Sequence, residues 1–202
     1  MRNTPKQKIN FSAITLQSAM EMIGRDAFLR WSLNAQPKQQ SDFFIETMHR
    51  LEIFDLESSE QAKTLLIDAL FAEIVPSHPK LKIWKAAVLT SDTLTGVADY
   101  LMAPHRAYLA IPLLCVCEAK RDDFEKGRVQ CLAEMIACKW NNTQNGVEID
   151  VYGVVSNGQG WRFYKLEQSG DVFETDQYGL NGLPELLGAL DFICSECAKN
   201  VP

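Results

Sequence analysis

Residues 110–120, AIPLLCVCEAK, form an apolar run that ends in two charged residues separated by one alanine. A run as apolar as residues 110–117 is typical of a strand inside a sheet. Side chains alternate across a strand, so Glu118 and Lys120 are expected to point to the same face. Buried charges are costly unless they are paired or bind a metal ion, so this strand end is the first candidate site.

The strand expected just before it, residues 94–102, places Asp99 inside another apolar stretch. If the two strands pair through the turn at residues 104–106, Asp99 lies beside Glu118. The two carboxylates and the backbone carbonyl of Ala119 then offer oxygen ligands for Mg²⁺ or Mn²⁺, and Lys120 is placed to orient or deprotonate a water. The alternatives are a surface hairpin with a Glu118–Lys120 salt bridge and an Asp99 that caps a turn.

Apolar periodicity and turn residues predict the other elements of an α/β fold. The chain up to residue 57 is expected to be an N-terminal helical extension, with helical patterns in residues 11–33 and 42–51. Ser58 and Gln61 form a capping box for the next helix. Residues 58–202 are expected to form one domain in the order α, β, β, β, α, β, β, α. Its expected elements are residues 59–75, 81–89, 94–102, 108–119, 124–140, 148–155, 161–166 and 183–197.

Asp99, then Glu118-Ala119-Lys120 on the next strand, then a helix that contains Gln130, resemble the PD-(D/E)XK nuclease superfamily. The sequence is most similar to the N-terminal nuclease domain of type I restriction enzyme R subunits and their stand-alone relatives. The resemblance covers residues 57–166. It implies a restriction-endonuclease-like α-β-β-β-α-β core, in which helices flank a mixed central sheet.

The resemblance also implies roles for residues that the pattern alone does not single out. Glu60 matches a glutamate of the first core helix that joins the metal cluster, and Gln130 matches a glutamine that faces the site. The turn at residues 154–158 is similar to the family's "TNG" turn. Glu60 also suits a helix N-terminus, and Gln130 equally suits a solvated helix flank. Ala98 stands where the family has proline.

The charge balance limits how the chain can contact nucleic acid. A net charge of −6 and a pI near 5.1 argue against binding through a broad field of positive charge. Local phosphate contacts are therefore expected from Arg121, Lys126 and Arg128, which lie near the proposed site. The alternative for these three residues is a solvated helix edge.

Together these features predict a metal-dependent nuclease that hydrolyses phosphodiester bonds in DNA, of restriction, defence or repair type, with Mg²⁺ or Mn²⁺ as cofactor. The sequence does not distinguish DNA from RNA. One alternative is a catalytically lapsed domain that serves as a nucleic-acid or protein interaction module. Another is a scaffold, such as a homodimer, assembled through the N-terminal helices.

The sequence also predicts the setting of the protein. No apolar run approaches the roughly 18 residues of a membrane-spanning helix, and residues 1–10 lack the apolar block of a signal peptide. We therefore expect a cytoplasmic protein without a membrane partner. Its six cysteines are expected to be free thiols.

Overall fold

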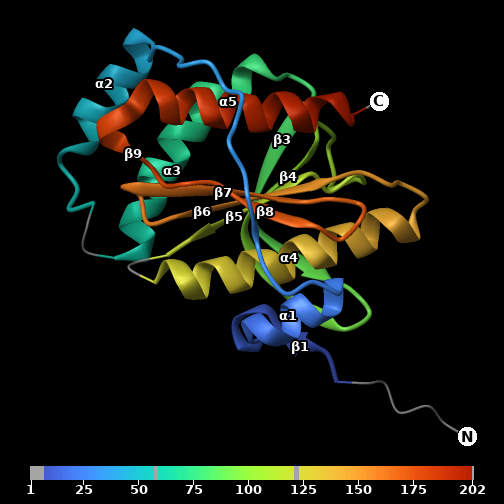
Figure 1. Cartoon of the computed structure of the whole chain (residues 1–202). Helices are drawn as coiled ribbons and strands as arrows, with labels where there is room; N and C mark the ends of the chain where they lie inside the picture. The colour runs from blue at the N-terminus through green and yellow to red at the C-terminus, as the bar shows by residue number, and fades with distance from the viewer. Residues whose placement is uncertain (1–6, 57–58, 121–122, 202) are drawn as a thin grey trace, which may run out of the picture.

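A mixed β-sheet lies between two layers of helices in the computed structural model, which describes residues 7–56, 59–120 and 123–201 (Figure 1). In Figure 1, α3 and α5 cover one face of the sheet, and α4 and α1 cover the other. Two hydrophobic clusters fill the spaces between the sheet and these two layers. The protein is therefore of the α/β class expected from the sequence. The helices are α1 (Leu16–Ile23), α2 (Asp42–Leu51), α3 (Glu60–Ile74), α4 (Phe124–Gln144) and α5 (Leu183–Lys199), with short 3-10 turns η1 (Phe11–Ala13), η2 (Val75–Ser77) and η3 (Leu180–Gly182).

The strands of the described residues join in the order β1-β4-β5-β6-β7-β8-β2, while β3 pairs with β4 and β9 pairs with β7. The consecutive strands β3, β4 and β5 are antiparallel, as expected from the sequence, whereas β5 and β6 are parallel. Parallel neighbours need a long crossover, which α4 supplies. The strands are β1 (Ile9–Asn10), β2 (Leu29–Arg30), β3 (Leu81–Thr90), β4 (Leu94–Pro104), β5 (Cys115–Ala119), β6 (Val151–Ser156), β7 (Gly160–Leu166), β8 (Val172–Glu174) and β9 (Tyr178–Gly179).

The strand expected at residues 108–119 begins only at Cys115. Pro112 lacks the amide hydrogen that a strand ladder requires, and the chain before Cys115 is held in another way. Leu113 donates its backbone N–H to the side chain of Asn142 and accepts a hydrogen bond from the same side chain, each over 2.8 Å. A buried amide of α4 thus replaces strand pairing where the sequence alone suggested a continuous strand.

The helix before the sheet starts at a different cap from the one expected. Ser59 is the N-cap of α3, because its side chain accepts a hydrogen bond from the backbone N–H of Ala62. Ser58, which we expected to form the capping box, lies outside the described residues. The helix nevertheless spans nearly the predicted range.

The chain before residue 57 contributes strands as well as helices. β1 pairs with β4, and β2 pairs with β8, so this segment reaches both the β4 side and the β8 edge of the sheet. The helical pattern over residues 11–33 predicted α1 but missed both strands. Two-residue strands carry no periodic signal of their own, because only their distant partners define them.

Over residues 7–56, 59–120 and 123–201, no helix is both long enough and apolar enough to cross a lipid bilayer.

Candidate metal centre

The candidate centre starts at the carboxyl end of β5, where two charged side chains leave a fully buried strand. Every residue of β5 is buried, and Glu118 is 0% exposed. Lys120 Nζ lies 2.8 Å from Glu118 Oε2, which confirms that both side chains point to the same face. The approach of the amine does not have hydrogen-bond geometry, and neither Glu118 oxygen has a hydrogen-bond donor among the described residues. The carboxylate is therefore removed from water, and among the described groups the Lys120 ammonium offsets its charge.

Asp99 reaches the same place from β4. Tyr100 pairs with Cys117, so Asp99 stands one residue further along, level with Glu118. Its Oδ2 accepts a hydrogen bond of 2.9 Å from the backbone N–H of Ala119. The Asp99 carboxylate thus accepts the hydrogen bond that a backbone carbonyl would accept in a regular strand pair, at the point where β4 and β5 separate. It lies beside Ala119, the residue that follows Glu118.

The backbone is strained across the sheet from Asp99. β3 and β4 pair regularly on both sides of Ala86 and Asp99, which lie opposite one another without a regular pair of their own. Ala86 has a φ of +50°, a left-handed conformation that costs a residue with a Cβ roughly 1–2 kcal/mol. Such strain tends to occur where a surrounding structure fixes a functional residue.

A third carboxyl group, from α4, completes the cluster. Glu134 is 0% exposed, and its Oε2 has no hydrogen-bond partner in the described part of the chain. Burial raises the pKa of Glu134 well above its ordinary value, and the nearby charges of Glu118 and Asp99 raise it further. Gln130 Nε2 donates to Glu134 Oε1 at 3.3 Å and opposes this effect. Glu134 therefore lies close enough to Glu118 for the two carboxyl groups to influence each other electrostatically.

The described side chains, in their positions in this structure, include no group of three or more His, Cys, Asp and Glu residues arranged to hold a metal ion. Mg²⁺ usually uses one or two protein carboxylates and keeps several waters. Asp99 and Glu118 supply that number. Because both Glu118 oxygens lack donors, the donor set fits a hard divalent cation.

Close packing of α4 against the sheet positions Lys120. A Cβ built on Gly127 would lie 2.7 Å from Val155 Cγ1 and 2.9 Å from Lys120 Cγ. Only glycine lets the first turns of α4 approach β6 and the Lys120 side chain this closely. Gly127 was not among the residues predicted from the sequence, although an isolated glycine inside a helical pattern is a signal for close packing.

The turn after β6 lies beside the start of α3. Its residue Gly158 has a φ of +86°, and a Cβ built on it would lie 3.2 Å from Leu66 Cδ1 and 3.5 Å from Lys63 Cβ, both on α3. Ser156 Oγ accepts a hydrogen bond from Gly158 N–H, and Asn157 Oδ1 accepts one from Gly160 N–H. Because Ser156 pairs with Ala119, this ordered turn brings the first turns of α3 toward the end of β5.

Two other predicted site residues lie wholly or partly outside the part of the chain that the structure describes. Glu60 is the first residue of α3, but its side chain is outside the described part of the structure, and so is the whole of Arg121. Lys126 is exposed in the first turn of α4. The Arg128 side chain is 16% exposed and pairs with the carboxylates of Glu125 and Glu174.

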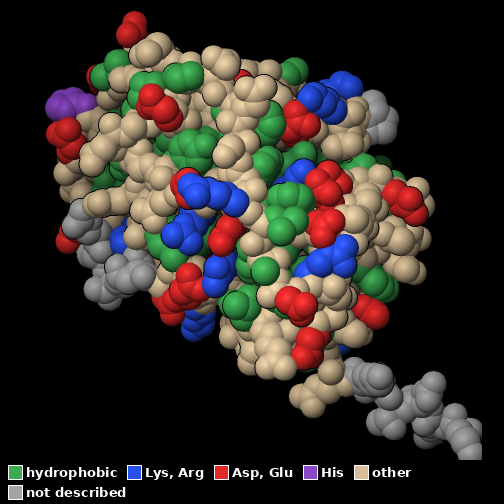
Figure 2. Space-filling view, in the orientation of Figure 1, with side chains coloured by type: hydrophobic (Ala, Val, Ile, Leu, Met, Phe, Trp, Pro, Cys, Tyr) green, Lys and Arg blue, Asp and Glu red, His purple; other side chains and the backbone are tan. Residues whose placement is uncertain are grey.

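The surroundings of Arg128 form a charged network on the β8 side of α4. Arg128 pairs with Glu125 and lies 3.5 Å from Glu174, which Arg162 approaches at 4.0 Å. The Arg128 guanidinium also stacks over Phe28, 5.0 Å from the ring centroid. Figure 2 shows that blue and red side chains alternate on this part of the surface. Its positive charge is therefore largely compensated within the protein.

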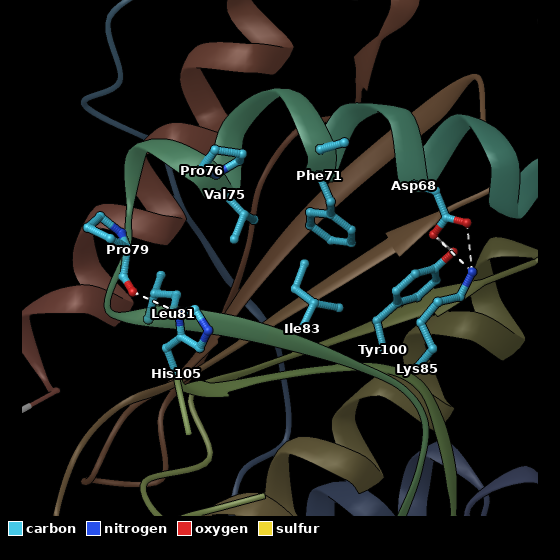
Figure 3. Close-up of a pocket in the computed structure, with 11 residues that line it drawn as sticks. Asp68, Phe71, Val75, Pro76, Pro79, Leu81, Ile83, Lys85, Tyr100 and His105 are labelled. Atoms are coloured by element: carbon cyan, nitrogen blue, oxygen red, sulfur yellow. Dashed lines mark hydrogen bonds and ion pairs between the residues drawn. The ribbon is translucent and has the colours of Figure 1, made fainter. Parts of the chain in front are cut away.

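A separate cavity of about 560 Å³ lies on the opposite face of β4, between α3 and β3 (Figure 3). Its wall is mostly apolar, with Phe71 and Ile83 facing each other in Figure 3. The polar groups at one end bind one another. Tyr100 Oη donates to Asp68 Oδ1 at 3.0 Å, and Lys85 Nζ bonds both Asp68 oxygens. The polar groups of this cavity already bond one another. The carboxylate cluster of Asp99, Glu118 and Glu134 is therefore the stronger candidate for a catalytic site.

Comparisons with known proteins do not add to this picture. No protein-family model matches the chain, and no curated protein shows significant sequence similarity to it.

Proposed function

We propose that this protein is a metal-dependent nuclease with a restriction-endonuclease-like core, acting on phosphodiester bonds, with DNA as the first substrate to test. The observation that carries the proposal is the Glu118 carboxylate, fully buried beside Asp99 and Glu134 without a hydrogen-bond donor. A divalent cation at this point would offset the repulsion among the carboxylates, beyond what Lys120, 2.8 Å from Glu118, already offsets.

The order of elements supports the same proposal. α3, β3, β4, β5, α4 and β6 follow one another in the α-β-β-β-α-β order of the PD-(D/E)XK core. The three motif residues lie on β4 and at the end of β5, as in that superfamily. A fold can be retained after its catalytic activity is lost, so the proposal depends on the site and not on the order of elements alone.

Each residue has a distinct role in the proposed reaction. Asp99 and Glu118 hold Mg²⁺ or Mn²⁺, with Glu60 and the Ala119 carbonyl as further candidate ligands. The cation supplies Lewis-acid chemistry that activates water and offsets charge on the phosphate. Lys120, held by Glu118 and by the first turns of α4, orients the attacking water. Gln130 restrains Glu134, and Lys126 contacts a neighbouring phosphate.

The proposal is tested with Mn²⁺ on single-stranded, double-stranded and branched DNA, and on RNA of the same sequences. Glu118→Gln and Lys120→Ala are expected to lower the cleavage rate by at least about 10²-fold while the circular dichroism spectrum is unchanged. Glu125→Gln, a matched change at an exposed glutamate of α4, is expected to cleave at the wild-type rate. Equal activity of all four proteins contradicts the proposed site.

The net charge of −6 favours a second candidate, an interaction module that has lost catalysis. Calorimetric titration with Mn²⁺ separates the two functions. The nuclease is expected to bind the ion saturably, and Asp99→Asn is expected to abolish binding. A protein without binding and without cleavage supports the interaction module.

A further inference from the structure

The cavity between α3 and β3 lies at an edge of the sheet. Among the described residues β3 pairs only with β4, so its other side is open. Phe71 and Val75 of α3 point toward Leu81 and Ile83 of β3 across the cavity (Figure 3). Its volume of about 560 Å³ and its mostly apolar wall are typical of a site for a small molecule. The nuclease reaction proposed above makes no use of this space.

The cavity is elongated. The lining residues of β3 run from Leu81 to Lys85, a distance of about 13 Å along an extended strand. The lining residues of the helical segment run from Asp68 to Val75, about 10 Å along a helix axis. This shape suits an extended chain that lies parallel to β3.

The end of the cavity beside Lys85 is electrically balanced. Lys85 Nζ lies 2.9 and 2.7 Å from the two Asp68 oxygens, and Tyr100 Oη donates to Asp68 Oδ1. Burial and the neighbouring Asp68 charge raise the pKa of Tyr100, so its hydroxyl stays protonated at neutral pH. This end therefore offers no free charge to a ligand.

The other end of the cavity lies beside cations that have no carboxylate partner. Pro79 and His105 line the cavity, and they also line a second hollow of about 270 Å³ whose wall includes Lys80 and Arg106. Lys80 Nζ donates to the backbone carbonyl of Val201 over 2.9 Å. Over residues 7–56, 59–120 and 123–201, no carboxylate forms an ion pair with Lys80 or Arg106. In a chain of net charge −6, this local positive charge attracts an anion.

We propose that the cavity binds an amphipathic anion, a small molecule with an apolar chain and a carboxylate or phosphate headgroup. The chain lies between α3 and β3, and the headgroup meets Lys80 and Arg106 beside His105. Both parts of the ligand are needed to match the site. An uncharged lipid leaves the cations without a partner, and a nucleic-acid strand leaves the apolar wall uncovered.

Titration calorimetry of the full chain with decanoate and with decyl phosphate tests the proposal. Each ligand is kept below the concentration at which it forms micelles, and at least one is expected to bind saturably, with one molecule per chain. The tighter of the two identifies the headgroup. Octanoate is expected to bind more weakly than decanoate, by up to roughly fourfold for each methylene removed. Decanol, which has the chain without the charge, is expected to bind at least about tenfold more weakly.

A pair of lysines tests the position of the headgroup. Lys80→Gln and Arg106→Gln are each expected to weaken binding of the anions at least about threefold and to leave decanol binding unchanged. Lys82→Gln is the matched control. Side chains alternate along β3, so Lys82 points away from the cavity, and its Nζ lies over the Trp84 ring, 4.4 Å from the centroid. This variant is expected to bind like the wild type.

A bulky side chain tests the position of the apolar chain. Ala72 is an exposed residue of α3 that lines the cavity, so Ala72→Trp is expected to fill the space and abolish binding while the circular dichroism spectrum is unchanged. A wild-type protein that binds neither decanoate nor decyl phosphate overturns the proposal. So does binding that Ala72→Trp leaves intact, or that Lys82→Gln weakens as much as Lys80→Gln does. The test requires neither metal nor DNA, so its outcome is independent of the proposed nuclease activity.

Discussion

Replacing Glu118 with glutamine is expected to abolish the stabilisation of the folded protein by Mn²⁺ or Mg²⁺. In the wild type the ion is expected to bind the folded state only, because Asp99 and Glu118 come together through the pairing of β4 with β5. A ligand of this kind stabilises the folded state by about 2.7 kcal/mol at a free concentration of 100 times its Kd. For a domain of about 200 residues, 1 kcal/mol corresponds to roughly 2–4 °C in Tm, so the expected rise is about 5–11 °C.

Glutamine has nearly the same shape as glutamate but removes the negative charge that attracts the ion. The Tm of Glu118→Gln is therefore expected to stay constant over the metal titration. Each protein is first freed of metal with a chelator. Thermal unfolding followed by circular dichroism then measures the Tm of the wild type and of Glu118→Gln at each metal concentration. Glu125→Gln serves as the control, because its 67% exposed side chain lies on α4 away from the cluster, and its Tm is expected to rise like that of the wild type.

Two results refute this reasoning. The first is a wild-type Tm that does not respond to Mn²⁺ or Mg²⁺, which shows that the buried carboxylates bind no cation. The second is an equal rise in the wild type and in Glu118→Gln, which places the ion elsewhere.

Three further predictions concern the same core. In metal-free buffer the raised pKa of Glu134 keeps it protonated in the folded state at pH values where the unfolded chain has already lost that proton. The free energy of unfolding therefore falls as pH rises above about 4.3, by at most about 1.4 kcal/mol per pH unit. Urea unfolding is expected to show that Glu134→Gln gains stability over the wild type as pH rises, and a constant difference contradicts this. Gly127→Ala is expected to cost about 1–3 kcal/mol and to displace Lys120, so an unchanged cleavage rate and an unchanged urea midpoint argue against the close packing. All six cysteines are buried, so a thiol reagent is expected to label them only in denaturant, and rapid labelling of the native protein rejects their burial.

Strand geometry explains why the candidate metal centre lies apart from the apolar cavity between α3 and β3. Asp99 and Tyr100 are neighbours on β4, so their side chains point to opposite faces. Tyr100 closes the end of the cavity beneath α3, and its hydroxyl bonds Asp68. Asp99 instead meets the end of β5. The apolar cavity beneath α3 and the candidate metal centre therefore lie on opposite faces of β4.

The sequence by itself determined the features that depend on neighbouring residues. Apolar runs gave the core strands and helices, and alternation along one strand placed Glu118 and Lys120 on the same face, where their charged groups are 2.8 Å apart. The order of β4 and β5 also indicated that Asp99 lies beside them. These inferences need only local periodicity and one tight connection between strands.

Only the tertiary structure decided which distant groups meet. Glu134 joins the cluster because α4 crosses back over β5, and Arg128 pairs with Glu174, a residue 46 positions later in the chain. β1 and β2 likewise exist only through pairing with β4 and β8. Burial and electrostatic environment arise from contacts between segments far apart in the chain, and a sequence pattern records the residues but not those contacts.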